Sequence, residues 1–565
     1  MARNILNTCL KTASFSILFQ IFCRFISFTI NAFIVRFVGR DVLGIMNVRL
    51  LLIESTLLFL SKEAISRAAL STTTQHKNKS TWPQLINQMW ITVPICALVS
   101  FPVVYAWLNW LSPVGDLHYE QYVFSAMLMA ISCVFELTAE APIFVGQVFC
   151  FVKLKVVLDT LHIVTRSIIF VCIILYDKNM AIMAFGLAQF TSAATIVIGN
   201  YAFFHYYIRK LKEYREMVKK NDNDKTLALE KFGPYYDHME DFPFTGVTQM
   251  IPCVWTDDEP RFNKDLQVLV LSFVKQGVLK QILTEGEKYV MTISPVLSFA
   301  QQATYDVVNN MGSLAARFIF RPIEDSCYFY YTQTIARDVA LKDQPRNKVL
   351  EAATVLSQVC RAVTSIGLLG LVFGQSYAGT LLLLYGGADF VSGGLPETLL
   401  RWHCVAIVLL AVNGVTEGYI FATKTSKEID AYNYYMAIFS VTFLLLSYQL
   451  TNMFGPVGFI LANICNMVFR ISYSTNYITK QFNTVQMKPL QGLLPGKMFA
   501  AVLLVVGLTC KFSESNILPH SIIYHLLVGV LCGAVAMVSW CYENRALVQI
   551  GIDRVKSGKP AEKVQ

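Results

Sequence analysis

The sequence contains little charge for its length. Of its 565 residues only 15% are Asp, Glu, Lys or Arg, whereas 55% are hydrophobic. A soluble globular domain carries roughly 25% charged residues. This deficit, together with a mean hydropathy of +0.48, excludes an ordinary soluble protein and indicates a chain that lies largely in lipid.

The chain also lacks the residue patterns of metal, disulfide and nucleotide sites. Its 14 cysteines form no Cys-x-x-Cys pair, so we predict neither a metal site nor a disulfide framework. The nearest two histidines, His520 and His525, are five residues apart and do not share a helix face. No Gly-x-x-x-x-Gly-Lys-Ser/Thr loop occurs, which argues against ATP as an energy source. We therefore expect no cofactor.

Long hydrophobic runs, by contrast, are abundant. A membrane-spanning helix needs about 20 mostly apolar residues, and by this measure the chain contains about 14 candidates. They are 13–36, 44–66, 86–110, 121–148, 154–176, 181–207, 266–292, 303–336, 354–375, 400–421, 432–450, 455–476, 496–511 and 520–542. The first run carries Arg24 and lacks a small-residue cleavage site, so we predict a retained helix rather than a cleaved signal.

Lys and Arg are distributed unevenly between the connections. If the N-terminus is cytosolic, most of them lie on cytosolic segments such as 209–220 and the C-terminal tail. The positive-inside rule then predicts that both termini are cytosolic. The predicted organisation is a six-helix lobe over 1–207, a cytosolic linker over 208–265, a second six-helix lobe over 266–480, and two extra helices with a basic tail over 481–565.

Ionisable residues inside the spans are the most informative feature. Each costs about 2.5–3.5 kcal/mol at mid-bilayer, so we expect most of them to line a shared polar interior. Glu63 and Arg67 are four residues apart and can pair. The predicted cavity cations, which would bind a diphosphate, are Arg24, Arg49, Arg67, Lys280, Lys288, Arg317 and Arg321. The predicted acidic or polar cavity residues are Asn31, Glu63, Glu136, Glu140, Glu285, Glu287, Asp306 and Glu324.

Two interpretations of these charges stay open. They could form buried ion pairs that only lock the helices together. Alternatively, the surplus of Arg and Lys suits an anionic headgroup, because arginine binds phosphate through bidentate, charge-assisted hydrogen bonds. The charged spans recur at matching places, the first and second in one half and the seventh and eighth in the other. Transporters built from repeats show this arrangement.

Six segments carry distinctive motifs in order along the chain. They are NAFIVRF at 31–37, NVRL at 47–50, EAISRA at 63–68, VKLKV at 152–156, TEGEKYVM at 284–291 and ARFIFRPIE at 316–324. These motifs resemble the Rft family of oligosaccharide-lipid proteins. That family is identified as part of the multidrug, oligosaccharidyl-lipid and polysaccharide exporter superfamily, which includes the bacterial lipid II flippases.

The resemblance implies both a fold and a function. The implied fold is an all-α polytopic membrane protein with two six-helix lobes around a polar central cavity and two further C-terminal helices. The implied function is movement of dolichyl-diphosphate-linked Man5GlcNAc2 from the cytosolic to the lumenal leaflet of the endoplasmic reticulum, for protein N-glycosylation. Asn31 stands where the bacterial pattern has an acidic residue, which argues against carrying over cation coupling.

We therefore expect a transporter rather than an enzyme. A multispanning glycosyltransferase generally needs lumenal carboxylates, and the largest lumenal connection, 376–399, offers only Asp389 and Glu397. A non-transporting accessory or scaffold protein of the N-glycosylation machinery stays open as an alternative. The expected partners are the lipid-linked oligosaccharide, membrane lipid and the glycosylation machinery. We expect no nucleic acid, because the cytosolic connections account for the net charge of +9.

Overall fold

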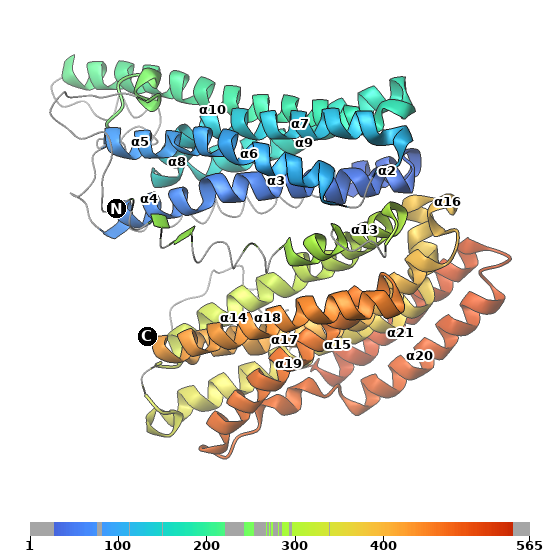
Figure 1. The fold of residues 1–565 in the computed structure, drawn as a ribbon. Coiled ribbons are helices and arrows are strands. Elements are labelled where there is room, and N and C mark those ends of the chain that lie inside the picture. Colours follow the sequence, from blue (N-terminus) through green and yellow to red (C-terminus); the bar gives the residue numbers. More distant parts are fainter. Residues whose placement is uncertain are drawn as a thin grey trace. The chain divides into compact units, whose positions relative to one another are not determined.

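Helices make up nearly all of the described chain (Figure 1). The computed structural model describes residues 28–75, 82–111, 114–149, 151–220, 242–252, 267, 270–271, 273–274, 281, 285–292, 297–337 and 339–545. No β-strand occurs in these ranges. The predicted all-α class is therefore confirmed.

Eleven helices in the described ranges are long and apolar enough to cross a membrane. They are Arg40–Leu70, Trp82–Asn109, Leu117–Val148, Lys153–Tyr176, Lys178–Val218, Arg346–Gly386, Leu395–Thr423, Ala431–Phe454, Val457–Asn483, Pro489–Asn516 and Ile522–Glu543. Each overlaps one of the predicted runs. A shorter apolar helix, Phe28–Phe37, covers the described part of the first run. The total of about 14 stays a prediction, because much of 13–36 and 266–292 lies outside the described residues.

The chain divides into two compact units, 1–295 and 296–565. The first unit contains α2 (Arg40–Gly44), α3 (Leu51–Leu58), α4 (Ala64–Gln75), α5 (Trp82–Trp90), α6 (Thr92–Asn109), α7 (Asp116–Glu136), α8 (Glu140–Val148), α9 (Val152–Tyr176) and α10 (Ala181–Lys220). In it α10 packs along both α7 and α9 (Figure 1). The sequence-based boundaries at 207, 265 and 480 stay predictions.

Short irregular turns interrupt the long helices of the first unit. Two π-helical turns, Ile45–Leu50 and Phe59–Glu63, join α2 to α3 and α3 to α4. Each inserts extra backbone into the helix and contains charged residues, Arg49 in the first and Lys62 and Glu63 in the second. Because a π-helical turn changes the face on which later side chains lie, such turns are frequent at functional sites.

A 3₁₀ turn at Leu137–Ala139 separates α7 from α8, and its cause can be read from the sequence. Pro142 has no backbone N–H, so the carbonyl of Thr138 loses its usual helical partner four residues later. The hydroxyl of Tyr201 on α10 donates a hydrogen bond of 2.8 Å to that carbonyl. The side chain thus satisfies the acceptor that the proline leaves open.

An aromatic cluster closes one end of the first unit. Phe242 and Phe244, which lie within the long connection, belong to one hydrophobic cluster with Phe151, Phe204 and Tyr207. The same segment is held by the indole N–H of Trp90, which donates to the Met250 carbonyl at 2.8 Å. The described part of the connection is therefore packed onto the unit.

The second unit contains α13 (Phe299–Ala315), α14 (Arg321–Thr334), α15 (Arg346–Gly386), α16 (Ala388–Val391), α17 (Leu395–Thr423), α18 (Ser426–Phe454), α19 (Val457–Asn483), α20 (Lys497–Asn516) and α21 (Ile522–Glu543). A π-helical turn, Ala316–Phe320, joins α13 to α14 directly before Pro322. The two extra C-terminal helices are present as α20 and α21. They lie side by side, with α20 against α15 (Figure 1).

Candidate functional site

Lys62 lies between two buried carboxylates in the first unit. Its Nζ is 3.6 Å from Glu140 Oε2 and 3.9 Å from Glu136 Oε1. Ser66, one helical turn after Lys62, donates a hydrogen bond of 2.6 Å to the other oxygen of Glu140. The two glutamates are only 8% and 5% exposed. Sequence reasoning found both glutamates but missed Lys62 and Ser66, although their spacing of four residues on an apolar helix was a usable signal.

A second buried network links three helices of the same unit. Glu54 on α3 accepts a hydrogen bond of 2.8 Å from the side-chain amide of Gln189 on α10. Arg166 on α9 lies 3.8 Å from the Glu54 carboxylate and donates to the Gln189 side-chain oxygen at 3.1 Å. The predicted site includes none of these three residues. The network joins α3, α9 and α10 at a depth where unpaired charges are costly.

A cavity of about 660 Å³ lies beside the Lys62 cluster, entirely within the first unit. Its polar wall includes Lys62, Glu140 and the pair formed by Glu63 and Arg67, whose side chains approach to 2.6 Å. The Glu63–Arg67 ion pair is the one that the four-residue spacing predicted. The apolar wall of the cavity is formed by α9 and α10, together with parts of α4 and α8. The first unit thus holds a polar cavity within the region of its apolar spans.

Arg49 is almost completely buried, with 1% of its surface exposed. It lies in the π-helical turn between α2 and α3. Arg49 is one of the predicted diphosphate ligands, and its side chain lies inside the packed unit rather than on the wall of the cavity.

The described residues of the seventh predicted run pack against α3. Ser55 donates to Glu285 at 3.3 Å, and the hydroxyls of Thr56 and Tyr289 lie 2.8 Å apart. Lys288 and Glu285 form an ion pair of 3.0 Å. Glu287, also predicted, is half-buried. Glu285 and Tyr289 therefore contact the polar side chains of α3 within the first unit.

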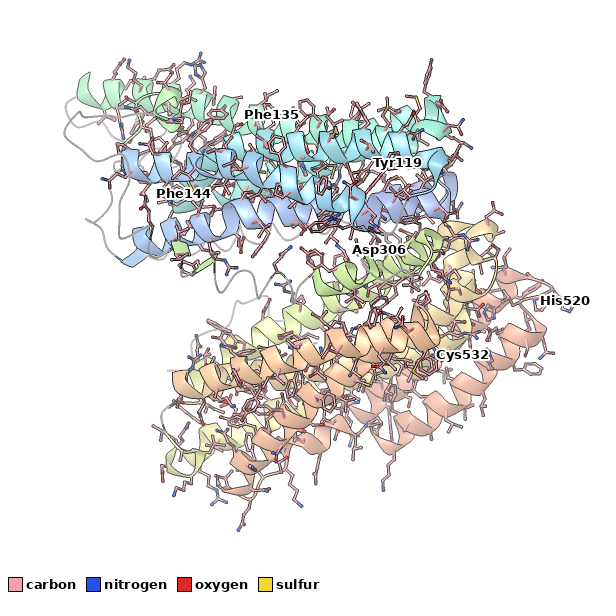
Figure 2. The ribbon with its side chains drawn as sticks, in the orientation of Figure 1. Tyr119, Phe135, Phe144, Asp306, His520 and Cys532 are labelled. Carbon is pink, nitrogen blue, oxygen red and sulfur yellow. The ribbon has the colours of Figure 1, made fainter. Side chains whose placement is uncertain are left out.

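The predicted stripe of the second unit runs along α13 and α14. Asp306 on α13, labelled in Figure 2, accepts a hydrogen bond of 3.2 Å from Asn310. Arg321 is exposed, and its side chain forms no hydrogen bond or ion pair within the described residues. Glu324 lies against the backbone of α17, where a Cβ added to Gly414 would come within 2.9 Å of its Oε2. The glycine thus lets the carboxylate approach α17 closely.

A buried ion pair of the second unit was missed by the sequence analysis. Arg470 on α19 lies 2.5 Å from Glu417 on α17. The same carboxylate accepts from the hydroxyl of Tyr432 at 2.7 Å and from the side-chain amide of Asn413 at 3.1 Å. With three donors, Glu417 has the partners that a buried carboxylate needs. This cluster matches the interpretation in which charges lock helices together.

Lys424, also missed, is buried among tyrosines at the end of α17. Its Nζ donates to the Tyr473 hydroxyl at 2.7 Å and lies 4.7 Å from the ring centres of Tyr473 and Tyr477. Aromatic faces attract an ammonium group, so a lysine is accommodated there without a carboxylate.

The remaining predicted residues are placed as follows. Arg24 and Lys280 lie outside the described residues, as does the side chain of Arg317. Asn31 is exposed on the helix Phe28–Phe37. Within the described ranges, no group of three or more His, Cys, Asp or Glu is arranged to hold a metal ion.

Three cations of the first unit are paired with carboxylates rather than isolated. Lys62, Arg67 and Lys288 each lie beside a carboxylate, which lowers the cost of holding a charge in the absence of a ligand. A phosphate oxygen is as good an acceptor for these groups as a carboxylate is. The clusters can therefore exchange an internal partner for an anionic ligand.

Comparisons with known proteins agree with one another. The Rft protein family model matches residues 8–554. The chain is 57% identical over 552 residues to the Man(5)GlcNAc(2)-PP-dolichol translocation protein RFT1 of Drosophila melanogaster. The matched region covers 97% of this chain and 98% of that protein. It is 36% identical to the protein of the same name from Xenopus tropicalis, over 94% of both chains.

A solved structure of similar fold is the lipid II flippase MurJ in an inward closed conformation. The match has a TM-score of 0.58 at 12% sequence identity and covers 94% of this chain and all of that one. At this identity the likeness concerns the fold, and it supports the fold class expected from the sequence.

Proposed function

Because the chain belongs to the Rft family, we propose that it moves dolichyl-diphosphate-linked Man5GlcNAc2 from the cytosolic to the lumenal leaflet of the endoplasmic reticulum membrane, for protein N-glycosylation. The observation that carries the proposal is the 57% identity, over nearly the whole chain, to a relative named for translocating this lipid. The polar clusters inside a multi-pass membrane protein support it, since a sugar-diphosphate headgroup needs a polar environment during its passage.

The diphosphate is held by the cations of the predicted site. Arg321 is suited to this role because it is exposed and its guanidinium has no ion-pair or hydrogen-bond partner within the described chain. Arg67 and Lys288 exchange Glu63 and Glu285 for phosphate oxygens, and the released carboxylates return when the ligand leaves. The remaining predicted cations, Arg24, Arg49, Lys280 and Arg317, stay proposals for the same role.

The proposed activity is transport rather than catalysis. No bond in the lipid-linked oligosaccharide is made or broken, so its mass is the same before and after translocation. Direction comes from consumption of the product in the lumen or from an ion gradient, because the sequence has no ATP-binding loop. The accessory or scaffold role remains the alternative, and contacts with the N-glycosylation machinery are part of both proposals.

The proposal is tested by neutralising the arginines of the α13–α14 stripe. In cells that depend on this protein, Arg317→Ala/Arg321→Ala is expected to lower N-glycosylation while the protein's abundance stays unchanged. Arg346→Ala, at the exposed start of α15, is the matched control and is expected to preserve glycosylation. Equal loss of abundance and function in the double variant would instead indicate that the arginines only stabilise the fold.

A further inference from the structure

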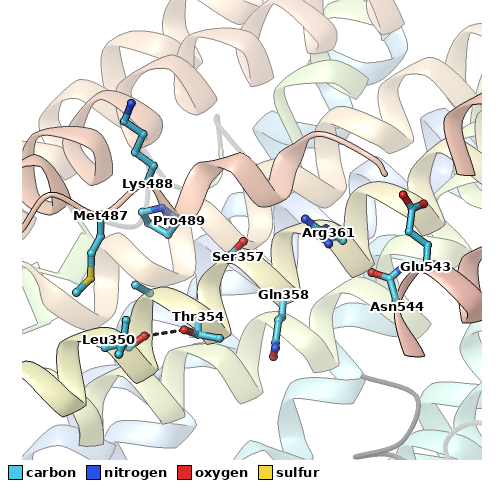
Figure 3. Close-up of a pocket in the computed structure, with 11 residues that line it drawn as sticks. Leu350, Thr354, Ser357, Gln358, Arg361, Met487, Lys488, Pro489, Glu543 and Asn544 are labelled. Carbon is cyan, nitrogen blue, oxygen red and sulfur yellow. Dashed lines mark hydrogen bonds between the residues drawn. The ribbon is translucent and has the colours of Figure 1, made fainter. Parts of the chain in front are cut away.

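A pocket at one end of the second unit belongs to none of the clusters described above. It has a volume of about 390 Å³ and lies between the start of α15, the connection from α19 to α20, and the end of α21. Figure 3 shows Arg361 between Ser357 on one side and Glu543 and Asn544 on the other, with Lys488 extending from the connection. The predicted site includes none of these residues.

The backbone of the connection fixes one wall of this pocket. A short 3₁₀ helix, Pro489–Leu493, packs against α15. Gly492 lies directly on the Ser357 carbonyl, so that a Cβ at this position would overlap the backbone of α15. Before it, Gln486 adopts a φ of 58°, which turns the chain back after α19. Lys488 therefore lies in a segment that packs tightly against α15.

The cations of the pocket have no partners of their own. Within the described residues, neither the Arg361 side chain nor the Lys488 side chain forms a hydrogen bond or ion pair, and Arg361 Nε is buried without an acceptor. The one carboxylate of the pocket is Glu543, and it is already engaged. Its Oε2 accepts from the backbone N–H of Phe499 at 3.1 Å, at the N-terminus of α20, where the helix dipole stabilises negative charge. The pocket thus has an excess of positive charge.

The pocket lies outside the hydrocarbon core of the bilayer. With 41 residues, α15 is about 60 Å long, roughly twice the thickness of that core. Its polar first turns, which include Thr354, Ser357 and Gln358, therefore extend into the headgroup region. Arg346, Lys348 and Lys497 lie at the same ends of their helices, and the positive-inside rule assigns such an end to the cytosolic leaflet.

We propose that this pocket binds the phosphate-bearing headgroup of an anionic phospholipid of the cytosolic leaflet. Arg361 donates to two phosphate oxygens, Ser357 and Gln358 hydrogen-bond the headgroup, and Lys488 covers it from the connection. Basic pockets between helices on the cytosolic side bind anionic lipid headgroups in this way. The volume suits a headgroup such as inositol phosphate. This site is separate from the proposed transport of the oligosaccharide lipid and does not depend on it.

The test is native mass spectrometry of the purified full chain, titrated with phosphatidylinositol or phosphatidylcholine. The wild-type protein is expected to retain phosphatidylinositol selectively. Arg361→Gln is expected to weaken that binding roughly tenfold, as loss of a charge-assisted hydrogen-bonding partner predicts. Lys348→Gln removes one positive charge from the exposed face of the same helix and is expected to change nothing.

A labelling experiment keeps the proposal testable if Arg361→Gln is poorly folded. A photoactivatable phosphatidylinositol is expected to label wild-type peptides containing 350–361 or 487–489, and excess phosphatidylcholine is expected not to compete. Equal binding of the two lipids, or equal affinity of Arg361→Gln and wild type, would overturn the proposal. Displacement of the labelled lipid by millimolar inorganic phosphate would overturn the lipid assignment and identify free phosphate as the ligand.

Discussion

A lysine at membrane depth is stable only beside groups that compensate its charge. Lys62 lies beside Glu136 and Glu140, the second of which also accepts a hydrogen bond from Ser66, and Lys424 lies beside tyrosine rings and a tyrosine hydroxyl. The sequence analysis recognised charged residues of single helices, because a stripe can be read from spacing. It did not find their partners on other helices, since Glu417 and Arg470 are brought together only by tertiary packing.

Removal of the Lys62 ammonium is expected to destabilise the first unit. Lys62→Met leaves Glu136 and Glu140 buried without a cation, and loss of one partner of a buried pair costs about 3–5 kcal/mol. Thermal unfolding of the detergent-purified protein, followed by size-exclusion chromatography, should show a clearly lower midpoint. Lys153→Met, at an exposed position of α9, serves as the control. The same midpoint for both variants would contradict a stabilising role for the Lys62 cluster.

For the helices, the length of the hydrophobic runs predicted where the spans lie but not the residues at which the helices begin and end. All eleven apolar helices of the described chain overlap predicted runs. However, α15 begins at Arg346, well before the predicted 354–375, because its polar first turns are helical although they do not belong to a hydrophobic run. The π-helical turns were not predicted, because the hydrophobic periodicity of a helix does not reveal where one extra residue is inserted.

The break between α7 and α8 gives a prediction at this scale. Tyr201→Phe removes the donor that satisfies the Thr138 carbonyl next to Pro142. The unsatisfied acceptor is expected to cost about 1–3 kcal/mol. The thermal midpoint should therefore fall, whereas Tyr176→Phe, at a 91% exposed position, should leave it unchanged. If both variants unfold at the wild-type temperature, the Tyr201 hydroxyl is not needed to satisfy the Thr138 carbonyl.

The hairpin between α18 and α19 gives a second prediction about helix ends. Gly458 lies so close to the backbone of Leu450 that a Cβ would overlap it. Gly458→Ala is therefore expected to separate the two helix ends and destabilise the second unit by about 1–3 kcal/mol. Gly115→Ala, where nothing lies within 4 Å, is the control. A wild-type unfolding midpoint for Gly458→Ala would show that the hairpin can relax at no cost.

At the scale of the whole molecule, composition and motifs were sufficient for class and family. The low charge, the spans and the ordered motifs predicted an all-α membrane protein of the Rft family, which the structure and the comparisons confirm. The packing of the seventh predicted run could not be read in the same way. Residues 285–292 pack against Ser55 and Thr56, and such contacts are set by tertiary structure rather than by the polar connection that precedes them.

The orientation of the chain in the membrane follows from its charge distribution. The distribution of Lys and Arg predicts that both termini are cytosolic and that the connection from α20 to α21 is lumenal. A glycosylation acceptor inserted at 517–521 should be modified in microsomes, whereas one added after residue 565 should not. Modification of the C-terminal acceptor would contradict the proposed orientation.

The most direct test of the account is translocation by the purified protein in liposomes. Dolichyl-diphosphate-Man5GlcNAc2 is placed in both leaflets, and the fraction accessible to an external sugar-modifying probe is followed with time. We expect the inner-leaflet fraction to become accessible in proteoliposomes and not in empty liposomes, Arg321→Ala to slow this exchange, and the lipid to keep its mass. Binding of the lipid without any exchange between leaflets would contradict the transporter and favour the accessory role.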